Sequence, residues 1–190
     1  MNEIQTDEQV KEPTPERKFS VWQSLAWILV IGLLTVLALG LIRSRKGPVG
    51  VGEIVPDFIL TTFDGEQIQS EDLLGQVIVV NFWASWCKPC EQEAADLETA
   101  WRFYQSRGDV VFLGVDYVDT ETPALAYLEK FDITYPNGPD LRTRISQAYR
   151  ISGVPETYFI DRSGRLAYKR IGPFQTLDQI LAIIDPLLSE

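Results

Sequence analysis

The chain has 190 residues, a formal net charge of −10, two cysteines and no histidine. The missing histidine excludes Ser-His-Asp and Cys-His catalysis, haem ligation by histidine, and zinc sites built on histidine or on four cysteines. Two cysteines are too few for a disulfide framework, and an acidic chain argues against nucleic acid as a partner, because phosphate binding needs clustered Lys and Arg. We expect no cofactor and no metal.

The N-terminal part of the chain divides into a tail and an apolar segment. Residues 1–20 are mostly polar, contain two prolines and have no apolar period, which predicts a disordered tail. Residues 21–42 are predicted to be a transmembrane anchor. From Leu25 to Ile42 there is no charge and only one hydroxyl, and about 20 apolar residues cross the hydrocarbon core of a bilayer. Tryptophans near its start and basic residues after its end suit the two membrane interfaces.

A cleaved signal peptide is the alternative, since Ala38-Leu39-Gly40 is a small-x-small triplet. The apolar stretch exceeds the usual signal-peptide core of about 7–15 residues, which favours an uncleaved anchor. Basic residues are balanced on the two flanks, so the positive-inside rule does not set the orientation. Residues 43–53 are a glycine-containing linker, and residues 54–190 are the folded domain. The first 47 residues carry six basic and five acidic groups, a net +1, so the acidity belongs to the domain.

Strands and helices alternate along the domain. A short turn is expected at 70–73 with Ser70 as its N-cap, and the apolar run 77–83 predicts a strand buried on both faces. Asp161 to Gly164 predicts a hairpin turn. This order predicts an α/β fold with a mixed sheet. The expected strands are 58–62, 77–83, 110–115, 154–160 and 165–171, and the expected helices are about 88–106, 122–131, 141–149 and 176–188.

Both cysteines lie in the segment NFWASWCKPC, residues 81–90, between a buried strand and a helix. The C-x-x-C spacing places the two sulfurs across the first helical turn, close enough to bond. At the helix N-terminus, free N–H groups and the helix dipole lower the pKa of the Cys87 thiol and make it the nucleophile toward a client disulfide. Cys90, one turn further and more shielded, would attack the mixed disulfide. Lys88 adds positive charge, and Pro89 suits a first helical turn because it has no N–H.

Other interpretations of the cysteine pair are half of a metal site shared with another subunit, two inert core residues, or a structural disulfide. The preceding buried strand, Trp86 directly before Cys87, and the helix that follows favour a thioredoxin-like redox site.

The segment 78–90, IVVNFWASWCKPC, resembles the active-site strand and loop of thioredoxin-fold proteins. Upstream, VPDF at 55–58 resembles the N-terminal extension of the redoxin group, and downstream GVPETYFID at 153–161 resembles the cis-proline region. With the anchor, the chain resembles the membrane-anchored TlpA/ResA/CcmG (DsbE) thiol-disulfide oxidoreductases of cytochrome c biogenesis, in the redoxin (AhpC/TSA) superfamily. The resemblance covers residues 54–188. It implies a thioredoxin-like fold with an N-terminal β extension and an inserted helical segment at about 120–150.

The resemblance also assigns roles to residues. It implies that Cys87 is the nucleophile, that Cys90 is the resolving cysteine, and that Pro155 is the cis-proline beside the disulfide, with the Val154 backbone next to the client chain. The alternative for Pro155 is an ordinary trans proline at the start of a strand. Glu156 either lines the client groove or is a solvated charge at the strand end.

Glu93 stands three residues after Cys90, where ResA-like members carry an acid near the site. A carboxylate there raises the pKa of a thiol and can relay a proton. The alternative is that Glu91 and Glu93 only stabilise the first helical turn. Asn81 stands where thioredoxin has a buried Asp, and an amide cannot accept a proton, so Glu93 is the best candidate for a base.

The resemblance implies an extracytoplasmic enzyme held at the cell membrane. The implied client is a protein disulfide, in particular the cysteine pair of apocytochrome c, and the implied electron source is a membrane thiol carrier. With no histidine between the cysteines, we favour reduction over oxidation. Two alternatives are a copper(I)-binding assembly factor and a peroxiredoxin-like peroxidase. The first would lack the usual histidine ligand, and the second would have Ala84 where its family needs Thr or Ser.

Overall fold

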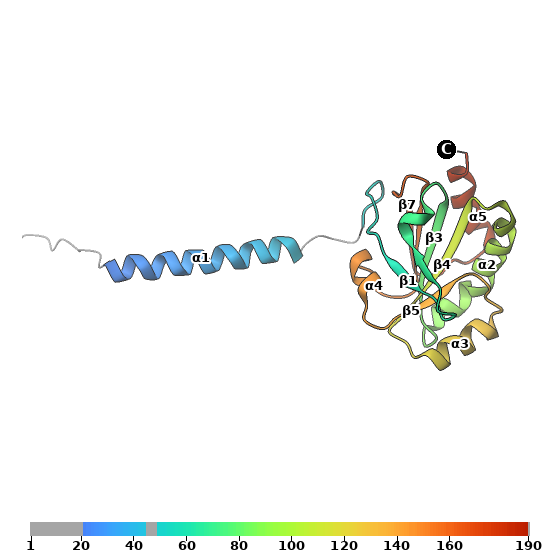
Figure 1. Ribbon diagram of the computed structural model, residues 1–190, viewed down its shortest axis with the longest axis horizontal. Helices are drawn as coiled ribbons and strands as arrows, with labels where there is room; N and C mark the ends of the chain where they lie inside the picture. Colours follow the sequence, from blue (N-terminus) through green and yellow to red (C-terminus); the bar gives the residue numbers. More distant parts are fainter. Residues whose placement is uncertain (1–20, 45–48, 190) are drawn as a thin grey trace, which may run out of the picture. The chain divides into compact units, whose positions relative to one another are not determined.

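The computed structural model describes residues 21–44 and 49–189, in two units that divide between Lys46 and Gly47 (Figure 1). The predicted tail, 1–20, and part of the predicted linker lie outside the described residues. The first unit is the helix α1, Val21–Ser44, with apolar residues all around it. Within the described residues, no helix combines the length and the hydropathy that a membrane crossing requires. The membrane anchor therefore stays a prediction.

The second unit is built on a five-stranded sheet of order β5-β4-β3-β6-β7. The pairs β3–β4 and β4–β5 are parallel, whereas β3–β6 and β6–β7 are antiparallel, which confirms the predicted mixed sheet and the predicted hairpin. The strands are β3 Val77–Trp83, β4 Val110–Tyr117, β5 Asn137–Asp140, β6 Glu156–Ile160 and β7 Leu166–Ile171. The strand β5 was not predicted, because its residues, NGPD, include none of the β-branched or aromatic types that favour strands.

Helices cover both faces of the sheet, with α4 on one side and α2 and α5 on the other (Figure 1). Val79 of β3 packs toward α2 and α5, and the next residue, Val80, packs toward α4. Alternate side chains of a strand point to opposite faces, so a strand covered on both sides has no polar face. The helices are α2 Lys88–Tyr104, α3 Glu121–Lys130, α4 Arg144–Tyr149 and α5 Leu177–Leu187.

A short antiparallel hairpin, β1 Ile59–Thr61 and β2 Gln67–Gln69, forms the predicted N-terminal extension. The prediction of Ser70 as a helix cap is wrong. Ser70 is the first residue of a 3₁₀ turn, Ser70–Leu73, and its Oγ accepts the Phe58 N–H at 2.9 Å. The hydroxyl joins the residue before β1 to the residue after β2, and the 3₁₀ turn has no side-chain cap.

The inserted segment carries α3, β5 and α4 between β4 and β6. The last helix of the segment begins at Arg144, three residues later than predicted. The buried carboxylate of Asp140 sets this start, because it accepts the N–H groups of Arg144 and Ser146, both at 2.8 Å.

The insertion packs so closely on the hairpin that Gly138 has no room for a side chain. A Cβ there would overlap the carbonyl oxygen of Thr61 and lie 2.9 Å from Leu60 Cδ1. We expect Gly138→Ala to lower the free energy of unfolding by about 3 kcal/mol, since overpacking against backbone cannot relax by rotamer change. Urea unfolding of the oxidised protein measures this. Gly153→Ala is the control, because its Cβ would meet nothing within 4 Å. Equal losses in the two variants would contradict the packing account.

Candidate redox site

The two cysteines form a disulfide where β3 ends and α2 begins, with their Cα atoms 5.3 Å apart. Cys87 is the N-cap residue of α2, and its Sγ accepts the backbone N–H of Cys90 at 3.2 Å. Pro89 lies in the first helical turn, as predicted. The bond and the position of Cys87 agree with the sequence analysis. A sulfur that receives a helix N–H is stabilised as a thiolate when the disulfide opens.

The surroundings of the disulfide are apolar, and both sulfurs are shielded. Cys87 is 3% exposed and Cys90 is 1% exposed, so the expected difference in shielding is small in this oxidised state. Trp86, directly before them, is exposed. The Lys88 ammonium is 3.0 Å from Glu91 Oε1, so its charge is partly neutralised. This ion pair is also the first cause of the lowered pKa of Glu91.

Glu93 is buried at 1% exposure and lies beyond the first turn of α2, so only Glu91 fits the helix-stabilising alternative. Its Oε1 accepts Asn81 Nδ2–H and its Oε2 accepts the Phe174 N–H, both at 2.9 Å. Burial raises the pKa of Glu93 to about 7, although these two hydrogen bonds and the charge of Arg170 oppose the rise. The side chain can therefore hold or release a proton near neutral pH.

Asn81 connects Glu93 to the strand that follows the cis-proline. Its Nδ2 also donates to the Thr157 hydroxyl at 3.0 Å, and Thr157 is paired with Asn81 in the β3–β6 ladder. The amide is thus a donor that positions the Glu93 carboxyl, which agrees with the expectation that Asn81 is not itself a base.

The Val154–Pro155 peptide bond is cis, as predicted. Glu156, the next residue, is 1% exposed, so of its two alternatives the solvated charge is wrong, and Glu156 is among the lining residues of the groove described below. Its Oε1 accepts the Ser152 N–H at 2.6 Å and its Oε2 accepts the Tyr158 hydroxyl at 2.8 Å. The carboxylate therefore braces the turn that leads into the cis-proline. Backbone N–H groups in a tight turn need such an acceptor, and no sequence pattern had indicated it.

A surface groove of about 290 Å³ runs between the start of α2 and the cis-proline turn. It brings together four of the predicted site residues, whereas Trp86, Lys88, Glu93 and the two cysteines are not among its lining residues. The lining residues are Pro89, Ser152, Gly153, Val154, Pro155, Glu156, Ile171, Gly172 and Pro173.

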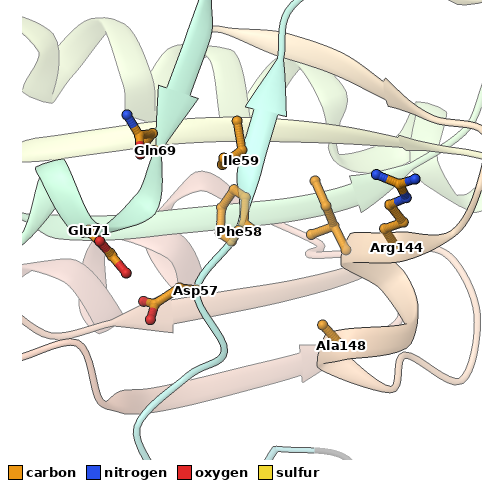
Figure 2. Close-up of a pocket in the computed structure, with 8 residues that line it drawn as sticks. Asp57, Phe58, Ile59, Gln69, Glu71, Arg144 and Ala148 are labelled. Atoms are coloured by element: carbon orange, nitrogen blue, oxygen red, sulfur yellow. The ribbon is translucent and has the colours of Figure 1, made fainter.

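Figure 2 shows a separate pocket of about 430 Å³ between the β1–β2 hairpin and α4. It shares no residue with the groove and includes none of the segment 81–93 that carries the cysteines and Glu93, so we do not assign the redox chemistry to it. Its lining residues are Asp57, Phe58, Ile59, Gln69, Glu71, Arg144, Ile145 and Ala148.

The active-site loop, residues 84–87, is held by two contacts that were not predicted from the sequence. Asp119, after β4, accepts the Ser85 N–H at 2.6 Å through Oδ2, and the Val118 carbonyl accepts Trp86 Nε1–H at 3.3 Å. A signal was present. The strands 77–83 and 110–115 were both predicted, and parallel neighbours end at the same edge, which places an acid after one beside the loop after the other.

Comparisons with known proteins agree with this geometry. The AhpC/TSA family matches residues 51–169. The thiol-disulfide oxidoreductase ResA of Bacillus cereus is 31% identical over 137 residues, which are 72% of this chain and 78% of the relative. ResA of Geobacillus thermodenitrificans is 32% identical over 149 residues, covering 76% and 85%. A thioredoxin-family thiol:disulfide interchange protein from Chlorobium tepidum superposes with a TM-score of 0.63 at 28% identity, covering 76% and 97%. The predicted thioredoxin-like fold is thereby confirmed.

Glu93 gives the oxidised protein a pH-dependent stability. Its carboxyl ionises near 4.5 in the unfolded chain and near 7 in the fold, so the unfolded state releases its proton first as pH rises. We expect Glu93 to reduce the free energy of unfolding between pH 4.5 and 7, by an amount on the order of 3 kcal/mol. Urea unfolding at several pH values, compared with Glu93→Gln, measures this, because Glu93→Gln removes that part of the slope.

Glu91→Gln is the matched control two residues away. The Glu91 carboxylate is paired with Lys88 and Lys130 near the surface, and its pKa is lowered. The Glu91→Gln protein should therefore keep the wild-type fall in the free energy of unfolding between pH 4.5 and 7. An unchanged slope in Glu93→Gln would contradict the burial account.

Proposed function

The chain belongs to the AhpC/TSA family and is a thiol-disulfide oxidoreductase, and we propose that it reduces client disulfides through Cys87 and Cys90. The observation that carries this proposal is the position of Cys87 at the helix N-cap, where its Sγ receives the Cys90 N–H. That position favours the thiolate form, which is the form that attacks a disulfide.

In the proposed reaction the reduced enzyme supplies two electrons. The Cys87 thiolate attacks one client sulfur, which forms a mixed disulfide and releases the other client sulfur as a thiolate. The Cys90 thiolate then attacks Cys87 Sγ, which releases the first client sulfur and forms the Cys87–Cys90 disulfide. The client ends as a dithiol, and a membrane thiol donor returns the enzyme to its reduced form.

Glu93 is the proposed proton acceptor for Cys90. It follows Cys90 by three positions on α2, and residues at this spacing are neighbours on a helix. A pKa of about 7 suits a group that takes a proton from a thiol and returns it at neutral pH. Asn81 and Phe174 support this role because their N–H groups fix both carboxyl oxygens.

The client is proposed to lie in the groove between Pro89 and the cis-proline turn. This places client backbone beside Val154 and Pro155, in a turn that Glu156 stabilises by accepting the Ser152 N–H. Trp86, directly before Cys87, is 56% exposed and offers an apolar surface, and Lys88, directly after Cys87, carries an exposed charge. An extended client segment with apolar side chains would fit these contacts.

We also propose that residues 21–42 anchor the enzyme in the cell membrane, with the redox domain, 54–190, on the extracytoplasmic face. The uncharged run from Leu25 to Ile42 supports the anchor. In line with the resemblance described above, the proposed client is the cysteine pair of apocytochrome c before haem attachment.

Replacing the cysteines separates the two steps. Cys87→Ser should lose nearly all insulin disulfide reduction, because no thiolate remains at the helix N-terminus. Cys90→Ala should also turn over poorly, but it should accumulate a mixed disulfide that reductant releases. Turbidity measures reduction, and non-reducing electrophoresis measures the adduct. Full activity of the Cys87→Ser protein would refute the proposed nucleophile.

The same Cys90→Ala protein identifies the client. Expressed in a cell that makes c-type cytochromes, it should hold apocytochrome c on Cys87, and the double variant Cys87→Ser/Cys90→Ala should hold none. Mass spectrometry of the captured proteins is the measurement. A broad set of secreted proteins in place of apocytochrome c would reject cytochrome maturation and indicate a general reductase.

A further inference from the structure

A second buried acid lies next to the active-site loop and has no role in the reaction described above. Asp116 of β4 is fully buried, and no donor in the described part of the chain bonds to either of its carboxyl oxygens. It pairs in register with Trp83, the last residue of β3 before the loop. A buried carboxylate without donors is costly, so this group favours its neutral form.

The neighbour that can share the Asp116 proton is Asp119. Asp119 is 7% exposed, and its two oxygens already accept the N–H groups of Ser85, at 2.6 Å, and Thr120, at 2.7 Å. Asp119 is thus an acceptor on the loop side, and burial, the charge of Asp119 and a side-chain hydrogen bond to Asp119 raise the pKa of Asp116 to about 8. One proton between two carboxyls is the stable arrangement when like charges cannot both be solvated.

Other ionisable groups around this pair do not replace Asp119. On α3, Tyr127 stacks on Trp83, and burial raises the pKa of its hydroxyl, so that it stays neutral. On α2, the charge of Glu93 raises the pKa of Tyr127. Among the described residues, only Asp119 changes the pKa of Asp116 appreciably. Opposite Asp116 on β5 stands Pro139, which carries no charge.

We propose that Asp116 and Asp119 form a proton-sharing pair that positions the active-site loop, and that loss of the shared proton loosens the loop before Cys87. Asp116 donates its proton to Asp119, and Asp119 holds the Ser85 N–H. When Asp116 ionises, its proton goes to solvent, and two buried like charges separate. The movement of Asp119 weakens its bond to Ser85, two residues before the nucleophile. Both acids are thus positioning residues.

The test uses the full-length oxidised protein, in which the bonded cysteines do not titrate. The side-chain carboxyl ¹³C shifts and the Ser85 amide shift are followed by NMR from pH 6 to 10. In wild type the carboxyl shifts of Asp116 and Asp119 and the Ser85 amide shift should show one shared transition near pH 8, separate from that of Glu93 near pH 7. Asp116→Asn keeps a donor toward Asp119 but cannot ionise, so the Ser85 transition should vanish. Glu93→Gln should keep it, which separates the pair from the acid beside Cys90.

A functional measurement follows the same transition. The rate of insulin disulfide reduction is measured for Asp116→Asn and for wild type at pH 7 and at pH 9.5. We expect the ratio of the variant rate to the wild-type rate to rise about threefold over this range, because only the wild-type loop loosens. A Ser85 shift that stays flat in wild type, or a transition that persists in Asp116→Asn, would overturn the proposal. If Asp116→Asn fails to fold, the wild-type carboxyl shifts alone decide. The NMR result does not depend on Cys87 being the nucleophile, so its failure is distinguishable from failure of the proposed function.

Discussion

The burial of β3 on both faces is the constraint on which the redox site depends. Because helices cover one side and the hairpin with α4 covers the other, the strand holds one register among its neighbours. Its last residue, Trp83, is fixed by a hydrogen bond from Nε1 to Asn137 Oδ1 at 2.8 Å. The strand ends at this edge of the sheet, and the chain reaches the N-terminus of α2 at Cys87, four residues after Trp83. The position of the nucleophilic cysteine therefore follows from where β3 ends.

Proton handling in this site falls to carboxyl groups, because the chain has no histidine. Burial moves Glu93 to a pKa of about 7 and Asp116 to about 8, the range in which histidine usually serves. The two acids differ in their hydrogen bonds. Glu93 has a donor at each oxygen and can bear a charge, whereas Asp116 has none and favours its proton. This difference suits Glu93 to exchange protons with a thiol and Asp116 to keep one.

The parts of the fold with a repeating apolar pattern could be predicted, and the parts held by single polar contacts could not. The runs that became β3 and β4 and the spacing of the α2 cysteines placed the sheet centre and the disulfide correctly. In contrast, β5 has no strand-like composition and forms only because β4 offers an edge. The role of Glu156 stayed open between a groove residue and a strand-end charge, since a sequence does not show which backbone N–H groups will turn toward a carboxylate.

Part of the acidity of the domain is structural, because several of its carboxyl groups are buried. A charge of −10 suggests a solvated acidic surface, yet six carboxyl groups of the described chain are buried: Glu93, Glu98, Asp116, Asp119, Asp140 and Glu156. Five of these accept backbone N–H groups, and the sixth is Asp116. An acid that accepts backbone donors fixes a turn without needing a partner side chain. Asp116 has no such donors, so it fixes no turn directly, and the proposed effect on the loop passes through Asp119.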